Sequence, residues 1–196
     1  MQTATLVVGA IVLVLLALRL VEAVFARHSA ETLDFRGPVR ALDVALATGE
    51  VTIRGGSRSG ARVRRTIRHG LRRPRITELV VDGVLRLRVP RGVVQYEIDV
   101  PAGASVHVEG NRASTTVIGL GGSVDLRAGR GSLEGRALAA RAVHAVTSTG
   151  SIRLSFDRAP DLVDVATQNG NVELVMPEGD TEVHTSAPGP VQIRSR

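Results

Sequence analysis

The second half of the sequence repeats short segments in which apolar and polar residues alternate. Five such segments start at residues 106, 124, 143, 163 and 183, at spacings of 18, 19, 20 and 20 residues. A second series starts at residues 133, 152, 172 and 191, at spacings of 19, 20 and 19 residues. The alternation predicts strands that bury one face, and glycines between them, as in Thr149-Gly150 and Asn169-Gly170, predict turns.

Strands that recur at a fixed period predict coils that stack on one another. A single coil cannot bury its apolar face alone, whereas parallel stacking joins the Val, Ile and Leu positions into continuous inner rows. We therefore predict an all-β fold, a parallel β-solenoid (β-helix-like), over residues 39–196. An antiparallel sandwich has a similar strand spacing and is the competing fold. The two interleaved periods favour the solenoid.

The first half is less regular. Its expected elements are a coil-like segment at residues 44–53, a strand at 62–68, a hairpin at 79–87 and a strand at 96–101. The hairpin turns at Asp82-Gly83, a dipeptide that favours two-residue turns. The last strand ends at Pro101, which has no N–H to donate to a neighbouring strand.

The N-terminal segment predicts a membrane anchor over residues 1–26. Residues 3–18 carry no charge, and a helix over residues 4–25 is ~33 Å long, enough to cross a bilayer. A cleaved signal peptide is the alternative, but it requires a basic start that this chain lacks. Residues 27–38 are expected to be a linker. Their arginines and Arg40 favour a cytoplasmic domain by the positive-inside rule. Because that rule is a statistical preference, the sequence alone leaves the side of the membrane open.

The amino-acid composition excludes several kinds of site. The chain has no Cys, which excludes disulfides, thiolate metal sites and cysteine nucleophiles. Its 25 basic residues are all Arg, and the formal net charge is +6, which suits an anionic partner. Only four residues are Phe or Tyr, so the chain offers few aromatic rings on which bases or sugars could stack.

Much of the positive charge lies in one run without acidic residues. It comprises Arg54, Arg58, Arg62, Arg64, Arg65, Arg68, Arg72, Arg73 and Arg75. Because the run is close to the predicted anchor, it suggests binding to anionic lipid or to a cell-wall polymer. A solvated basic loop is the simpler interpretation. No nucleic-acid-binding motif accompanies the run, so nucleic acid is not an expected partner.

The repeat also aligns titratable residues. His107, Asp125, His144, Asp164 and His184 occupy equivalent positions in five successive coils, each after an inward Val, and should form an outer ladder. Glu134, Arg153, Glu173 and Gln192 are aligned in the same way. Alternating charges stabilise neighbouring strands modestly, which explains the pattern structurally. The sharper hypothesis is a face that binds a divalent metal weakly or responds to pH.

Catalytic motifs are missing. The sequence has no Gly-x-Ser-x-Gly elbow, no HExxH and no phosphate-binding loop. Asp157, Asp161 and Asp164 lie close together, but the first two flank an Arg-Ala-Pro turn, where aspartate is common. We predict a chain without catalytic activity and without cofactors.

Several motifs together resemble a known family. VDGVLRLRVPRG, YEIDVPAGASVHVEG, TGSIRLSF and NGNVELVMPEGD are similar to the bacterial "putative adhesin" family of unknown function, from about Val39 to the C-terminus. The resemblance implies an extracytoplasmic solenoid behind a membrane helix, with no catalytic residues. The expected function is a binding or structural module of the envelope, with adhesion as one role. The alternative is a regulatory or sensor accessory protein that docks a membrane partner through the solenoid end, where the last strand is unprotected.

Overall fold

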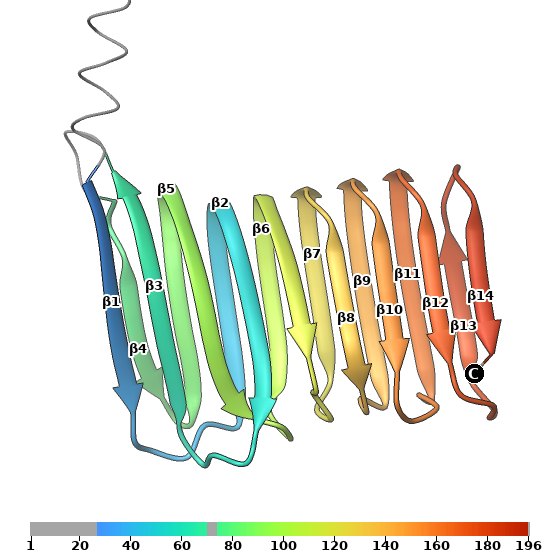
Figure 1. Ribbon diagram of the computed structural model, residues 1–196, viewed down its shortest axis with the longest axis horizontal. Helices are drawn as coiled ribbons and strands as arrows, with labels where there is room; N and C mark the ends of the chain where they lie inside the picture. The colour runs from blue at the N-terminus through green and yellow to red at the C-terminus, as the bar shows by residue number, and fades with distance from the viewer. Residues whose placement is uncertain (1–26, 70–73, 196) are drawn as a thin grey trace, which may run out of the picture.

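The computed structural model describes residues 27–69 and 74–195, and its regular elements there are all strands (Figure 1). The strands are β1 (Arg27–Phe35), β2 (Ala41–Gly56), β3 (Ala61–His69), β4 (Thr77–Val81), β5 (Val84–Pro101), β6 (Ser105–Ile118), β7 (Val124–Arg130), β8 (Leu133–Leu138), β9 (Ala142–Thr149), β10 (Ile152–Phe156), β11 (Leu162–Asn169), β12 (Val172–Met176), β13 (Glu182–Ser186) and β14 (Val191–Ser195). They form one largely parallel sheet of 14 strands. The predicted all-β class is confirmed.

The sheet folds into a stack of coils with two sides. Strands β2, β5 and β6 are long because each supplies both sides of one coil: residues 41–46 of β2 pair with residues 84–89 of β5, and residues 48–56 pair with residues 93–101. From β7 onward, two separate strands make each coil. The first face comprises β4, β7, β9, β11, β13 and the N-terminal parts of β5, β2 and β6. The second face comprises β1, β3, β8, β10, β12, β14 and the C-terminal parts of the long strands.

The strands of the second half pair in the register that the sequence repeat predicts. On the first face, Val124 lies beside Val143, Val143 beside Val163 and Val163 beside Val183. On the second face, β8, β10, β12 and β14 pair in the same parallel manner. An antiparallel sandwich would not place residues 18 to 20 positions apart side by side.

The order of the coils in space differs from their order in the sequence. β2 lies between β5 and β6, so the chain passes from β2 to the outer side of β5 and then returns to β6 (Figure 1). The outermost strands pair antiparallel: β4 with β5 on the first face, and β3 with β5 and β1 with β3 on the second.

Three segments of the first half for which the sequence predicts a structure lie at this antiparallel end of the stack. The hairpin is confirmed, because β4 and β5 meet at Asp82 and Gly83, whose φ angles of 52° and 76° give a two-residue turn. The strand expected at 62–68 is β3. Residues 27–38, expected to be a linker, are different: most of them form β1, which pairs along its whole length with β3.

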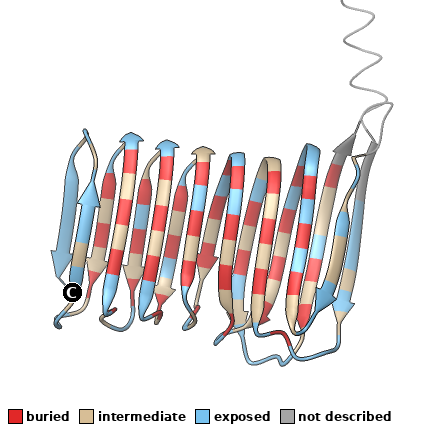
Figure 2. Ribbon diagram, turned by 180° about the vertical axis from the view of Figure 1, so that it is seen from behind, coloured by how far each residue is buried: buried red, intermediate tan, exposed pale blue. Residues whose placement is uncertain are grey.

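The core lies between the two faces. Along each strand, buried residues alternate with exposed or half-buried ones, and the buried positions of successive coils form continuous rows (Figure 2). Tyr96 and Phe156 are completely enclosed, and Val, Leu and Ile fill most other positions. Burial of each such aliphatic side chain stabilises the fold by about 1.5–3 kcal/mol. The rows therefore stabilise a chain that is poor in aromatic residues.

Glycines allow the coils to approach each other at one corner. Gly150 has a φ of 147°, and a Cβ there would lie 2.1 Å from the carbonyl oxygen of Gly131 in the preceding coil. The neighbouring Thr147 and Thr167 are buried, and their hydroxyls donate hydrogen bonds to the carbonyls of Gly131 and Gly150 at 3.1 Å. This arrangement explains why Thr-Gly and Asn-Gly recur at the predicted turns.

The predicted anchor at residues 1–26 lies outside the described residues. Within the described ranges, no helix is long and apolar enough to cross a membrane.

Candidate functional site

The aligned histidines and aspartates form a ladder on the first face. In register, His107 lies beside Asp125, Asp125 beside His144, His144 beside Asp164, and Asp164 beside His184. The ladder continues in the other direction to Asp43 beside His107 and to Arg86 beside Asp43. Basic and acidic side chains therefore alternate across seven neighbouring strands. The extension to Asp43 and Arg86 escaped the sequence analysis because β5 and β2 are out of sequence order in the stack.

The ladder consists of pairs. His107 Nδ1 lies 3.0 Å from Asp125 Oδ2, and His144 Nδ1 lies 2.9 Å from Asp164 Oδ2. His184 instead contacts Glu182 of its own strand, with 2.8 Å between Nε2 and Oε1. These side chains are about one-third exposed or more, and exposed pairs contribute about 0–1 kcal/mol each. In the described part of the chain, no three His, Asp or Glu side chains are placed to share a metal ion.

A second ladder follows the second face. Glu134 lies beside Arg153, Arg153 beside Glu173, and Glu173 beside Gln192. Arg153 and Arg194 approach Glu173 from either side, at 3.7 and 3.6 Å. As on the first face, opposite charges from neighbouring coils pair along the surface.

In the folded chain, acidic side chains from other strands compensate part of the charge of the arginine run. Arg62 and Arg58 lie 2.7 and 3.8 Å from Asp34, and Arg64 and Arg54 lie 3.1 and 3.8 Å from Glu97. The hydrogen bond donated by Arg62 holds the pKa of Asp34 below its usual range. The acids come from β1 and β5, so the sequence around the run gave no sign of them. Arg75 is exposed, and the side chains of Arg68, Arg72 and Arg73 lie outside the described residues. Binding of an anionic surface therefore stays a prediction.

Arg65 belongs to a buried network that sequence analysis missed. It forms ion pairs with Glu31 and, at 2.6 Å, with Glu78, whose side chain is only 7% exposed. Tyr96 Oη donates a hydrogen bond to Glu78 Oε1 at 3.0 Å, and burial raises the pKa of Tyr96 above its usual value. The network lies at the outer end of the stack, between β1, β3, β4 and β5.

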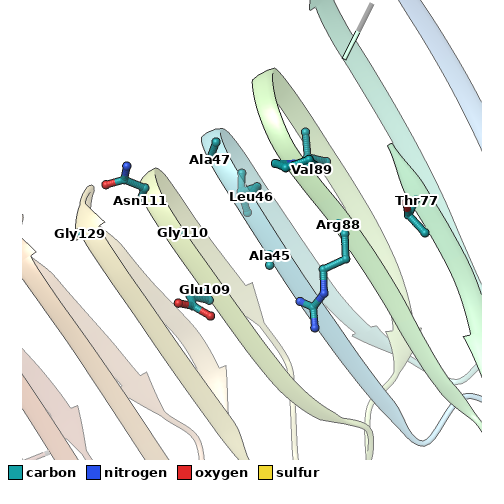
Figure 3. Close-up of a pocket in the computed structure, with 11 residues that line it drawn as sticks. Ala45, Leu46, Ala47, Thr77, Arg88, Val89, Glu109, Gly110, Asn111 and Gly129 are labelled. Carbon is teal, nitrogen blue, oxygen red and sulfur yellow. The ribbon is translucent and has the colours of Figure 1, made fainter. Parts of the chain in front are cut away.

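A hollow of about 750 Å³ opens at the corner of the coils that β5, β2 and β6 form (Figure 3). Its lining includes Ala45, Leu46, Arg88, Val89, Glu109 and Asn111. Arg88 is engaged by Asp43, at 2.9 Å between Nη1 and Oδ1. The clear pKa shifts in the described chain belong to Asp34, Arg62, Arg65 and Tyr96, none of which lines the hollow.

The aspartates weighed as catalytic groups are separated by their contacts. Asp164 is occupied by His144, whereas Asp157 and Asp161 are exposed residues around the turn between β10 and β11. Their backbone amides donate hydrogen bonds to Leu138 and Arg141 of the preceding coil.

The last coil leaves an open edge. β13 pairs only with β11, and β14 only with β12, among the described strands. Val191 and Ile193 continue the inner row of Val172 and Leu174, yet they are 39% and 52% exposed, against 1% and 0% for the latter two. Among the described residues, β13 and β14 therefore have one edge without a strand partner, beside the partly exposed Val191 and Ile193.

Comparisons with known proteins give structural similarity only. No protein-family model and no curated protein matches the sequence. A structure described as a putative cell adhesion protein from Clostridium sporogenes is 11% identical, with a TM-score of 0.48, and the match covers 87% of this chain and 100% of that one. A structure described as a putative adhesin from Bacteroides fragilis is 14% identical, with a TM-score of 0.37, and the match covers 86% and 97%.

A third structure, described as a putative adhesin from Parabacteroides distasonis, is 11% identical, with a TM-score of 0.38, and the match covers 87% of this chain and 95% of that one. The resemblance expected from the sequence motifs is confirmed to this extent: several such structures are similar to the chain over most of its length, at low identity. The likeness to these structures concerns the arrangement of the strands alone.

Proposed function

We propose that the chain is a membrane-anchored, non-catalytic binding or structural module of the bacterial envelope, built as a parallel β-solenoid and adhesive in its role. The observation that carries the proposal is the difference between the two ends of the stack. The chain enters the sheet at β1, and the open edge of β13 and β14 lies at the opposite end (Figure 1). The module would hold this edge away from its point of attachment.

The distance between β1 and the open edge follows from the spacing of the strands. Nine strands follow one another on the second face, from β1 to β14. At about 4.8 Å between neighbours, the edge lies roughly 40 Å from β1. The apolar residues 3–18 supply the anchor in this proposal, and the solenoid lies outside the cytoplasm.

The absence of catalysis is proposed from the engagement of the polar groups. Within the described residues, His107 and His144 of the ladder contact Asp125 and Asp164. The groups with shifted pKa values belong to the end network around Glu78 and to the Asp34 pair. Alternating ladders of this kind stabilise neighbouring coils and keep both faces hydrated.

The arginine run is proposed to contact anionic lipid headgroups or wall polymers near the anchor. Arg75 and the residues beyond β3 provide the charge that the pairs with Asp34 and Glu97 leave over. Co-sedimentation of the full chain with neutral and anionic vesicles tests this part. Equal recovery with both vesicle types would refute an electrostatic contribution.

A second candidate function is an accessory protein that docks a membrane partner through its far end. The open edge of β14 favours it, because an unpaired strand is a template for another chain. Binding of the full chain to isolated cell wall supports the adhesive module. Crosslinking from Gln192→Cys to one defined membrane protein, without wall binding, supports the accessory role.

A further inference from the structure

We propose that two copies of the chain associate tail to tail, with β14 of one copy pairing antiparallel with β14 of the other. This inference rests on the proposed role of the C-terminal end as a docking surface. The proposed occupant of that surface is a second copy of the chain. Pairing of the two C-terminal ends gives a symmetric dimer.

The open edge has the composition of an interior that lacks its next layer. Val191 and Ile193 follow Val172 and Leu174 in the inner rows, and all five residues of β14 are exposed. Removing such apolar side chains from water is favourable. A strand added to β14 would cover these side chains and satisfy the unpaired amide and carbonyl groups of the edge.

The opposite end of the stack cannot supply that strand. On β1, Glu31 points to the same side as Leu33, since its partner Arg65 follows Val63 on the inner side of β3. On β4, Glu78 lies beside the buried Leu87. Inward charges protect a strand edge, because pairing would bury them against apolar residues. A head-to-tail filament would place Glu31 or Glu78 against the row of Ile193, so a closed two-fold contact is favoured.

The sequence of β14 is complementary to itself. In an antiparallel pair centred on Ile193, each Ile193 faces its counterpart, and Val191 faces Ser195 of the second copy on the inner side. On the outer side, Gln192 faces Arg194 of the second copy, so an amide oxygen accepts from a guanidinium. Like charges do not oppose each other, and Arg194 is already balanced by Glu173 at 3.6 Å.

A different membrane protein is a less suitable occupant. Specific contacts between unlike proteins use complementary charged patches to select the partner, and interface hot spots in general are enriched in Trp, Tyr and Arg. β13 and β14 carry no aromatic residue, and their charged residues are Glu182 and Arg194, with His184 beside Glu182. An edge with no net charge and no aromatic anchor fits a copy of itself better than a partner selected by charge or by aromatic anchors.

The test is the mass of the full chain in detergent, by light scattering after size exclusion, over a range of concentrations. The unchanged chain and Val81→Lys should be dimers, because Val81 is 42% exposed at the opposite end of the stack. Ile193→Lys should weaken dimerisation about tenfold or more, since it places a charge in the paired row. A monomer at every concentration, or a dimer that Ile193→Lys leaves unchanged, would overturn the proposal.

Crosslinking provides a second measurement that does not depend on the Lys variant. The chain has no Cys, so Ile193→Cys gives one thiol per copy. Oxidation in native membranes should link two copies through residue 193 and none through the control Val81→Cys. A link from residue 193 to another protein would refute the second copy while keeping the docking role. Failure of residue 193 to crosslink to any protein would refute both.

Discussion

Tyr96 and Glu78 meet inside the N-terminal end of the stack, where the tyrosine hydroxyl donates a hydrogen bond to the carboxylate at 3.0 Å. Tyr96 is fully buried, and Arg65 holds the other carboxylate oxygen at 2.6 Å. The three residues come from β5, β4 and β3, so the contact ties the antiparallel strands to the outermost coil.

Removing the hydroxyl should destabilise the chain. Hydrogen bonds to charged groups contribute about 1.5–3 kcal/mol, so Tyr96→Phe should lower the free energy of unfolding by that amount. Urea unfolding of the full chain, followed by circular dichroism, measures it. In a Glu78→Gln background the same change should cost less, because the acceptor is no longer charged. A loss below about 0.5 kcal/mol in the unchanged background would argue against the hydrogen bond.

The pair of Asp34 and Arg62 should make stability depend on pH. The hydrogen bond from Arg62 lowers the pKa of Asp34 in the folded state, so the pair stabilises above the unfolded value near 3.8 and is lost as the pH falls through the lowered value. Asp34→Asn should therefore reduce the urea midpoint at pH 7 and reduce it less at pH 2. An equal reduction at both pH values would show that the effect is not the titration of this carboxylate.

The corner glycines should not tolerate a side chain. Gly150→Ala introduces a Cβ 2.1 Å from the carbonyl oxygen of Gly131, at a φ of 147°. Backbone strain of this kind costs about 1–3 kcal/mol, and the thermal midpoint should fall accordingly. Gly103→Ala is the matched control, since a Cβ there meets no atom within 4 Å. Equal midpoints for the two variants would contradict the close approach of the coils.

Truncation should be costly at buried inward-facing positions and nearly neutral at outward-facing ones. Leu174→Ala, at a position that is 0% exposed, should cost about 2–5 kcal/mol because it leaves a cavity. Leu162→Ala makes the same change at a position that is 36% exposed, and should alter stability by no more than about 0.5 kcal/mol. Chemical denaturation of both variants checks the contrast, and similar losses would place Leu162 in the core.

The second half of the fold was predictable from the sequence because each coil repeats the same pattern of strands and glycine turns. A Val of the inner side is the first or second residue of each first-face strand from β6 to β13, and Gly150 or Gly170 closes a turn, so the spacing alone gives the parallel register. The ladder from His107 to His184 follows directly from that register.

The first half was predictable only in part because its order depends on contacts far apart in the sequence. No local signal places β2 between β5 and β6, and so none indicates that Asp43 neighbours His107. Residues 27–35 become a strand because β3 offers them an edge. For the same reason the run from Arg54 reads as uncompensated charge in the sequence, whereas Asp34 and Glu97 compensate part of it in the structure.

The location of the domain tests the central claim most directly. A single thiol at Gln192→Cys, on the exposed strand β14, can be labelled in intact cells with a maleimide that does not cross membranes. An envelope module outside the cytoplasm predicts the same labelling before and after the cells are permeabilised. Labelling only after permeabilisation would contradict it and would place the C-terminal edge in the cytoplasm.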